Sequence, residues 1–214
     1  MLSGCDRPHV LDGESLRAML GGEGNAAVRT SLGLLSRFLL GMGRRLGFFR
    51  SPSLLRRLSR YYMPIGRRVV IVGGGLVGVE LAEFLADRGR EVTIIEKEAV
   101  AATEMAHPRR WRVLHDLREM GVTLWTDSCV ESIEEDHVVF SRPGPDEAME
   151  TGRVEADNVI LTLGLKDNPE LADQLRMEGI DPVCIGDSNG VGYIEGAISQ
   201  GFKAGLEIGD PATG

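Results

Sequence analysis

Three glycines and one glutamate carry the clearest chemical signal in the sequence. Gly73, Gly75 and Gly78 form a G-x-G-x-x-G motif, and Glu96 follows at the end of the next apolar run. In such a motif the first glycine permits a tight turn, the second lets the backbone approach a pyrophosphate, and the third lets a helix pack closely on the sheet. The pyrophosphate would lie on amide groups at the helix N-terminus, and the acid would accept hydrogen bonds from an adenosine ribose. The alternative is a glycine turn in an α/β domain that binds nothing.

The residues around this motif predict the elements that would hold it. A β-branched run over residues 69–72 leads into the glycines, and a second apolar run over residues 92–95 leads into Glu96. Both runs are typical of buried parallel strands. The helical pattern between them ends near Gly89, where glycine is favoured after a helix. We expect the buried face of this helix to carry Val77, Leu81, Phe84 and Leu85.

The remaining pattern predicts the fold class. A helix is expected from His107 to Gly121, with Trp111, Leu114 and Leu117 on one face. Strands are expected over residues 122–125, 129–133, 137–140, 149–154, 159–163 and 181–187, and a helix follows near residues 192–205. The sequence therefore predicts an α/β protein. Its Rossmann-like NAD(P)-binding domain would combine a parallel sheet and helices with an antiparallel β-meander.

One glutamate bears on the choice of nucleotide. Glu96 predicts NAD(H) rather than NADP(H), because a 2′-phosphate would meet its carboxylate. Lys97 and Arg90 are close to it in sequence and weaken this preference, so NADP(H) stays open.

The composition argues against several kinds of site. The chain has 214 residues, and 24 basic against 32 acidic side chains give a formal net charge of −8, which argues against a nucleic-acid binder. Cys5, Cys129 and Cys184 form no C-x-x-C pair, so no dithiol centre or cysteine-rich metal site is predicted. We expect His107 and His115 to be surface or capping residues. No catalytic and no metal-binding residue is predicted in this chain. Widely spaced cysteines, and the lack of a signal peptide or a membrane-length apolar run, predict a cytoplasmic protein.

Residues 25–68 stand apart, with ten arginines and no acidic residue. Leucines recur there at helical spacing, and Ser51-Pro52 is typical of a helix start. The favoured interpretation is a helical insertion that packs its apolar face on the body and leaves its arginines in water. Two alternatives stay open, namely docking of a partner protein and peripheral contact with an anionic membrane surface.

From about residue 67 to 208 the chain resembles the two-dinucleotide-binding flavoprotein oxidoreductases. Residues 73–82 read G-G-G-L-V-G-V-E-L-A, with Glu80 two positions after the third glycine, and are similar to the NADH-binding domain of that group. Leu161-Thr162-Leu163-Gly164 resembles the exit from that domain, although the family's proline is missing nearby. The resemblance implies nucleotide contacts at Gly73, Gly75, Gly78, Glu80, Glu96 and Gly164.

The C-terminal part resembles the end of the FAD domain of the same group. Gly186 and Asp187 are similar to the second FAD motif, in which the aspartate holds the flavin ribityl chain. Residues 192–205 are similar to the helix that presents backbone amides to the flavin. The residues alone also allow Asp187 to act as a helix cap, and the two roles can coexist. FAD is therefore expected only if the missing part of its domain is supplied.

Within the group the chain looks most similar to the old-yellow-enzyme-like multidomain reductases, the 2,4-dienoyl-CoA reductase, 2-enoate reductase and trimethylamine dehydrogenase type. Residues 9–20 resemble the segment that joins their FAD and NAD domains. Two features depart from the family: only one G-x-G-x-x-G is present, and no barrel for FMN and an iron–sulfur cluster is represented. The expected division is an FAD-domain-derived leader (1–24), a basic helical insertion (25–66), an NAD(P)H-binding domain (67–166) and the C-terminal part of an FAD domain (167–214).

Two functions follow as expectations. The first is an NAD(P)H-binding module of an FAD-dependent oxidoreductase, which passes hydride from a nicotinamide to a flavin as a fragment or subunit of a larger enzyme. Its partners would be NADH and the rest of a flavoenzyme. The second is a non-catalytic module that binds ADP or NAD and docks a partner through its arginine-rich insertion. Retention of flavin would separate the two.

Overall fold

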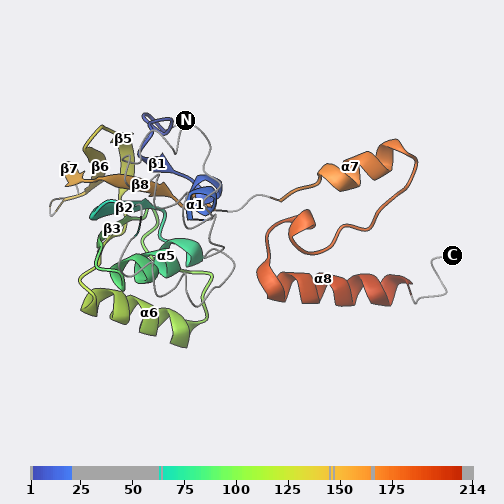
Figure 1. Ribbon diagram of the computed structural model, residues 1–214. Helices are drawn as coiled ribbons and strands as arrows, with labels where there is room; N and C mark the ends of the chain where they lie inside the picture. Colours follow the sequence, from blue (N-terminus) through green and yellow to red (C-terminus); the bar gives the residue numbers. More distant parts are fainter. Residues whose placement is uncertain are drawn as a thin grey trace, which may run out of the picture. The chain divides into compact units, whose positions relative to one another are not determined.

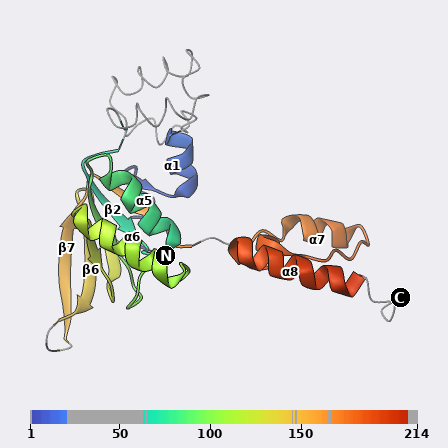
Figure 2. The same ribbon diagram turned by 90° about the horizontal axis from the view of Figure 1, so that it is seen from below.

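The computed structural model describes residues 2–20, 63, 65–144, 146, 148–164 and 167–208. The chain divides into two compact units, Met1–Leu163 and Gly164–Gly214. The arginine-rich stretch predicted as an insertion lies almost entirely outside the described residues, as do Pro64, Leu165 and Lys166. Figures 1 and 2 show the elements of each unit.

A five-stranded parallel sheet forms the centre of the first unit. Its order is β1-β8-β2-β3-β4, and every neighbouring pair is parallel. The strands are β1 (Val10–Leu11), β2 (Arg68–Val72), β3 (Glu91–Ile95), β4 (Thr123–Trp125) and β8 (Asn158–Leu161). The predicted strands at 69–72, 92–95, 122–125 and 159–163 are therefore confirmed, whereas β1 was not predicted.

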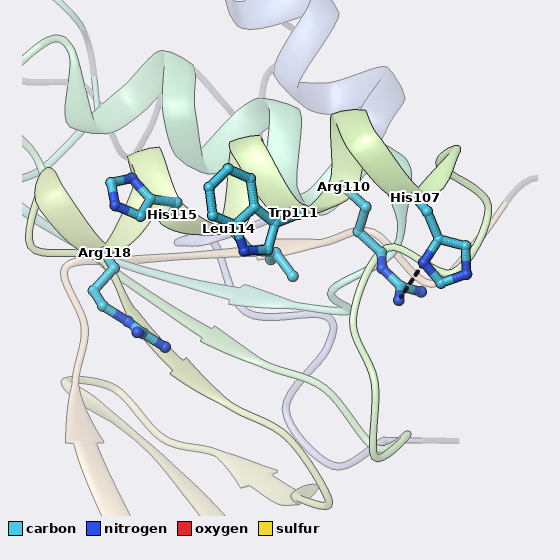
Figure 3. Close-up of a pocket in the computed structure, with 6 residues that line it drawn as sticks. All are labelled: His107, Arg110, Trp111, Leu114, His115 and Arg118. Atoms are coloured by element: carbon cyan, nitrogen blue, oxygen red, sulfur yellow. Dashed lines mark hydrogen bonds between the residues drawn. The ribbon is translucent and has the colours of Figure 1, made fainter.

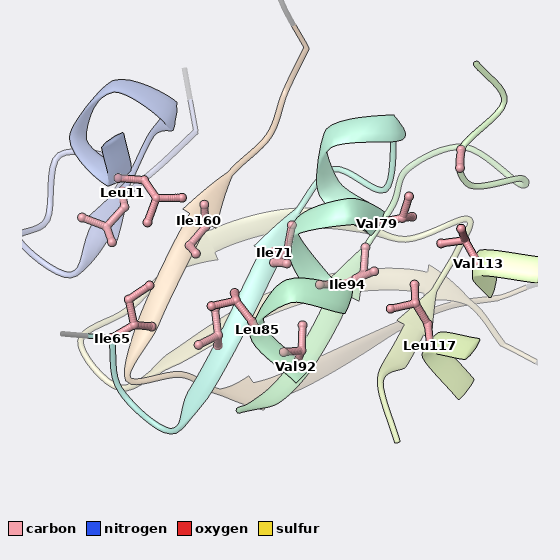
Figure 4. Close-up of a cluster of buried hydrophobic side chains, with 14 of the residues drawn as sticks. Leu11, Ile65, Ile71, Val79, Leu85, Val92, Ile94, Val113, Leu117 and Ile160 are labelled. Carbon is pink, nitrogen blue, oxygen red and sulfur yellow. The ribbon is translucent and has the colours of Figure 1, made fainter. Parts of the chain in front are cut away.

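Alternate residues of β2 serve the two faces of the sheet, because successive side chains of a strand point to opposite sides. Val69 and Ile71 pack in one core cluster with α5 (Leu76–Ala86) and α6 (His107–Glu119), and Figure 4 draws this cluster. Val70 and Val72 pack in a second cluster with the three-stranded antiparallel sheet. That sheet is the predicted β-meander and consists of β5 (Cys129–Ile133), β6 (His137–Pro143) and β7 (Met149–Glu155).

The sheet thus has helices on one face and a β-meander on the other, as Figure 1 shows. This arrangement confirms the predicted α/β class. The short helix α1 (Gly13–Leu20) follows β1, and Asp12 Oδ1 accepts the backbone N–H of Ser15 at 2.7 Å. Asp12 therefore caps α1.

Two predicted helix faces were wrong in part. On α5 the fully buried residues are Val79, Ala82 and Leu85, whereas Val77 is 46% exposed. Gly78 allows this helix to approach the sheet closely. The face of the helix that lies against the sheet therefore carries Val79, Ala82 and Leu85. On α6 the buried residues are Val113 and Leu117, whereas Trp111 is 72% exposed.

The second unit contains α7 (Glu170–Met177), the 3₁₀ turn η2 (Gly186–Asn189) and α8 (Tyr193–Ile208). The helix predicted near residues 192–205 is confirmed as α8. The strand predicted over residues 181–187 is wrong. Ile185 has extended backbone angles (φ −135°, ψ 159°), but the described part of this unit holds no strand with which it could pair. Extended backbone without a partner makes no ladder of hydrogen bonds.

No described helix is both long and apolar enough to cross a membrane.

Candidate dinucleotide site

The first glycine of the motif makes the turn out of β2. Gly73 has φ +108°, a conformation that side chains rarely adopt. A Cβ added there would collide with the backbone oxygen of Thr162. The N–H of Gly73 donates to the carbonyl oxygen of Ile95 at 2.9 Å, which ties the turn to the end of β3. Only glycine satisfies both the angle and the space.

The second glycine opens the start of α5. Gly75 is the N-cap residue of this helix, and no side chain caps it. The first amides of α5 therefore have no side-chain acceptor at the cap, and they form the positive end of the helix dipole. A Cβ added at Gly75 would meet no backbone, and its nearest neighbour would be Glu104 Oε1 at 2.8 Å. This geometry suits close approach of an anion to the backbone.

The third glycine lets α5 lie against the turn. A Cβ added at Gly78 would collide with the carbonyl oxygen of Gly73 and would lie 3.0 Å from Thr162 Oγ1. Gly78 is buried in the body of α5. Its lack of a side chain therefore sets the distance between the helix and the turn, as the motif predicts.

Backbone hydrogen bonds hold the Glu96 carboxylate in place. Its side chain is buried, with 7% of the residue exposed. Oε2 accepts the backbone N–H of Gly74, and Oε1 accepts the backbone N–H of Glu98 at 2.8 Å. Each carboxylate oxygen can accept more than one hydrogen bond, so Glu96 can still accept hydrogen bonds from the hydroxyl groups of a ribose. The carboxylate thus lies beside the glycine turn that would hold the adjoining phosphates.

Arg90 and Lys97, the two cations close to Glu96 in sequence, lie at different distances from it in the structure. Arg90 precedes β3, whereas Glu96 follows it, so the length of the strand separates their Cα atoms by roughly 20 Å. The Arg90 guanidinium reaches the carbonyl oxygens of Arg88 and Met63 instead. Lys97 Nζ lies 3.3 Å from Glu98 Oε1. Arg90 thus lies at the other end of the strand from Glu96, and the charge of Lys97 is partly balanced.

Glu80 joins the two helices of this face. Its Oε1 lies 2.6 Å from the Nη2 of Arg109, so the pair connects α5 to α6. Both side chains are exposed by more than 40%. An exposed ion pair of this kind stabilises a protein by about 0–1 kcal/mol.

Thr162 is a site residue whose role sequence reasoning did not identify. Its hydroxyl lies 2.7 Å from the carbonyl oxygen of Gly73 and 3.1 Å from that of Val72. Its N–H donates to the same Val72 oxygen at 2.9 Å. Thr162 therefore holds the glycine turn from the neighbouring strand β8. It stands in the segment that resembles the family's exit motif, and this was the signal available in the sequence.

The remaining predicted residues lie in the second unit. Gly164 has φ +98° and Gly186 has φ +65°. The N–H of Gly186 donates to Gln200 Oε1 at 2.8 Å, which joins η2 to α8. Asp187 Oδ1 accepts the N–H of Gly192 at 3.1 Å, just before α8 begins. Gly192 lies outside the helix, so this bond joins η2 to the approach to α8, and the expected capping role for Asp187 stays a prediction.

The site residues fall into two groups. Gly73, Gly75, Gly78 and Glu96 converge around the end of β2 in the first unit, with Glu80 further along α5. Gly186 and Asp187 are adjacent in the second unit.

A family model for the pyridine nucleotide-disulphide oxidoreductases matches residues 41–181. That match covers well over half of the chain. The chain belongs to this family.

Individual relatives agree with the assignment. The NADH oxidase of Thermoanaerobacter brockii is 32% identical over 142 residues, which are 65% of this chain and 21% of the relative. The nitric oxide reductase FlRd-NAD(+) reductase of Escherichia coli O7:K1 is 35% identical over 56% of this chain and 31% of the relative. A solved complex of 2-naphthoyl-CoA reductase matches with a TM-score of 0.57 and 26% identity, over 72% of this chain and 23% of that one. The chain thus spans between a fifth and a third of the length of these proteins.

The family assignment supports NAD(H) and FAD as the cofactors that proteins of this family use. The residues of the first unit fit a dinucleotide, because Gly75 leaves room at the uncapped end of α5 and Glu96 is held beside it. The second unit offers a smaller set toward FAD, consisting of the Asp187 carboxylate and the start of α8.

A groove elsewhere in the first unit holds none of the predicted site residues. It runs along the outer face of α6 and has a volume of about 340 Å³, and Figure 3 shows the side chains that line it. They are His107, Arg110, Trp111, Leu114, His115 and Arg118. The rings of Trp111 and His115 lie 5.7 Å apart. Both histidines are exposed, as expected. Among the described residues no cluster of histidine, cysteine and acidic side chains could hold a metal ion.

Proposed function

We propose that the first unit binds NADH for a flavin-dependent oxidoreductase and that the complete enzyme passes hydride from the nicotinamide to FAD. The observation that carries this proposal is the Glu96 carboxylate, held by the N–H of Gly74 beside the uncapped start of α5. A ribose and the pyrophosphate next to it need these two features side by side. The family assignment supplies the reaction class.

Each residue has a role that its geometry supports. The amides at the start of α5 would hold the pyrophosphate, and Gly75 would admit it to the backbone. Glu96 would accept hydrogen bonds from the adenosine ribose. Gly73, Gly78 and Thr162 would keep the turn in shape. NADH supplies the hydride and FAD accepts it, so these residues contribute binding and orientation and none of them transfers a proton.

NADH rather than NADPH is the proposed donor. A 2′-phosphate on the ribose would lie against the buried Glu96 carboxylate, and the repulsion would not be relieved by the distant Arg90. Lys97 is close in sequence but pairs with Glu98. Use of NADPH would require Lys97 to leave that pair.

We further propose that the chain forms the nucleotide-binding part of a larger enzyme of the old-yellow-enzyme-like multidomain type. The resemblance of residues 9–20 to the linker of those enzymes supports this. So does the small share of the 2-naphthoyl-CoA reductase that the chain covers. In such an enzyme Asp187 and α8 would complete an FAD site together with residues from elsewhere.

The test is the visible absorption spectrum of the purified chain, followed by titration with NADH. A colourless protein that binds NADH with micromolar affinity is the expected result. A yellow protein that NADH bleaches would also support the proposal and would show a complete FAD site. A protein with no affinity for NADH would contradict it. A protein that prefers ADP to NADH and never reacts with added flavin would favour the non-catalytic alternative.

A further inference from the structure

The loop after β3 is fastened directly onto the glycine turn. The N–H of Ala102 donates to the carbonyl oxygen of Gly74 at 2.7 Å, and the N–H of Met105 donates to Ala102 at 3.1 Å. Ala101, Ala102 and Met105 are buried, with 5% or less of each exposed. Ala102 has φ +52°, which is uncommon for a residue with a side chain. This loop therefore has a fixed position over the start of α5.

This loop places the carboxylate of Glu104 at the start of α5. Glu104 lies between the two buried anchors, and its side chain is exposed. Its Oε1 lies 2.8 Å from the position that a Cβ of Gly75 would take, with the other carboxyl atoms at 3.7 Å. Gly75 is the uncapped N-cap residue of α5. A negative group of the chain itself thus lies at this positive helix end.

We infer that Glu104 competes with the pyrophosphate of NADH for the start of α5 and so lowers the affinity of the site. This inference rests on the proposed function. Two like charges cannot share the place against Gly75, so the side chain must turn away when the dinucleotide binds. The loop backbone need not move. Rotation about the side-chain bonds of Glu104 is enough, and it leaves the backbone hydrogen bond between Ala102 and Gly74 intact.

The two glutamates of this site differ in the way they are held. Glu96 is buried and accepts two backbone N–H groups, so its carboxylate is fixed. Glu104 is exposed, and among the described residues no hydrogen bond or ion pair restrains its carboxylate. The fixed Glu96 carboxylate can therefore contact a ligand where it lies, whereas the Glu104 carboxylate can rotate away when a ligand binds. With the Glu104 side chain turned into water, a water-like dielectric and a separation of roughly 5–6 Å give a repulsion worth a factor of about 3 to 10 in affinity, and the repulsion falls with added salt.

The experiment measures the affinities of the full chain for NADH, ADP and adenosine by calorimetry, in buffer that contains EDTA. The variants are Glu104→Gln and Glu104→Lys. Glu119→Gln, which removes an exposed charge at the end of α6, is the control for net charge. We expect Glu104→Gln to bind NADH and ADP about 3- to 10-fold more tightly than the native chain. Glu104→Lys should bind more tightly still, adenosine should be unaffected, and the gain should shrink at high salt.

Three results would overturn the inference. One is unchanged or weaker binding of NADH by Glu104→Gln. Another is an equal gain for adenosine, which has no phosphate. The third is an equal gain for Glu119→Gln. In each of these cases the native chain still binds NADH, so the proposed function stands. If neither the native chain nor any variant binds NADH or ADP, the proposed function fails and the inference falls with it.

Discussion

The Glu96 carboxylate accepts a hydrogen bond from the backbone N–H of Gly74, 22 residues earlier in the chain. This bond joins the end of β3 to the turn after β2. The Gly73 N–H bonds to the carbonyl oxygen of Ile95 in the same region. The acid proposed to bind the ribose and the turn proposed to bind the phosphates are therefore parts of one structure, and a change in one should affect the other.

Replacement of Glu96 by glutamine tests this coupling. The amide nitrogen of glutamine cannot accept a hydrogen bond, so the N–H of Gly74 or that of Glu98 would lose its partner. We expect the free energy of unfolding to fall by about 1–3 kcal/mol and the affinity for NADH to fall about 10- to 100-fold. Denaturant unfolding and calorimetry would measure the two effects. Glu98→Gln is the matched control, since Glu98 pairs only with the exposed Lys97 among the described residues, and it should change neither quantity by much.

The preference for NADH over NADPH should depend on Glu96 and not on Arg90. Replacement of Arg90 by alanine removes a cation at the opposite end of β3. The ratio of the NADH and NADPH dissociation constants should stay the same in this variant. Glu96→Ala removes the carboxylate that a 2′-phosphate would meet, so the ratio should move toward NADPH by about tenfold. An Arg90 variant that loses affinity for NADPH alone would place that guanidinium at the ribose and contradict this account.

The three glycines should differ in what they contribute. A methyl group at Gly78 would collide with the carbonyl oxygen of Gly73, so Gly78→Ala should lower the free energy of unfolding by several kcal/mol (about 2–5). A methyl group at Gly75 would meet only the flexible Glu104 side chain. Gly75→Ala should therefore fold with nearly native stability and bind NADH at least about tenfold more weakly. Thermal melting and NADH titration of both variants separate stability from binding. A Gly75→Ala variant with native affinity would argue against pyrophosphate contact at that residue.

Local sequence was enough to predict the glycine turn, because each glycine has a role that depends on its near neighbours. The strand that leads into Gly73 and the helix that follows both form as expected. Thr162 could not be assigned in the same way. Its hydroxyl reaches Gly73 only because β8 lies beside β2, in a register that pairs Val72 with Leu161. Parallel pairing between segments about 90 residues apart is a tertiary feature that periodicity does not reveal.

The wrong predictions also have tertiary causes. Periodicity showed that α5 and α6 have apolar faces, but Val77 and Trp111 were assigned to the buried side and are exposed. The face of a helix that is buried depends on which residues can approach the sheet most closely. On α5 that residue is Gly78, so the buried face includes Gly78 and its neighbours. The apolar run at residues 181–185 has the composition of a strand, yet Ile185 has no strand to pair with among the described residues of its unit. A strand needs a neighbour, and composition alone cannot supply one.

Thr162 offers a direct test of the support that β8 gives to the turn. Thr162→Val keeps the shape of the side chain but removes the hydroxyl, so the carbonyl oxygen of Gly73 loses its partner. We expect a loss of about 1–2 kcal/mol in the free energy of unfolding and a modest loss of NADH affinity. Thr162→Ser retains the hydroxyl and should keep most of both. Equal behaviour of the two variants would mean that the methyl group, and not the hydrogen bond, matters at this position.

The opposite end of the sheet should make stability depend on acid pH. Asp157 Oδ2 accepts the backbone N–H groups of Arg67 and Arg68, both at 2.9 Å, and Oδ1 lies 2.6 Å from the Arg68 guanidinium. The hydrogen bonds from the Arg68 side chain, followed by its backbone N–H, hold the pKa of Asp157 below its ordinary value near 3.8. A pKa that is lower in the folded state stabilises the fold above the unfolded-state pKa, and this contribution is lost as the pH falls through the folded-state value.

Asp157→Asn should therefore lower the free energy of unfolding at neutral pH by on the order of 1–2 kcal/mol. The difference between the variant and the native chain should shrink as the pH falls below about 4, because protonation then removes the same charge from the native protein. Denaturant unfolding at several pH values would measure it. Asp116→Asn is the control, since that carboxylate lies 3.7 Å from the His115 ring on the exposed side of α6. A difference for Asp157→Asn that stays constant down to the lowest pH would show that shape, and not charge, explains the effect.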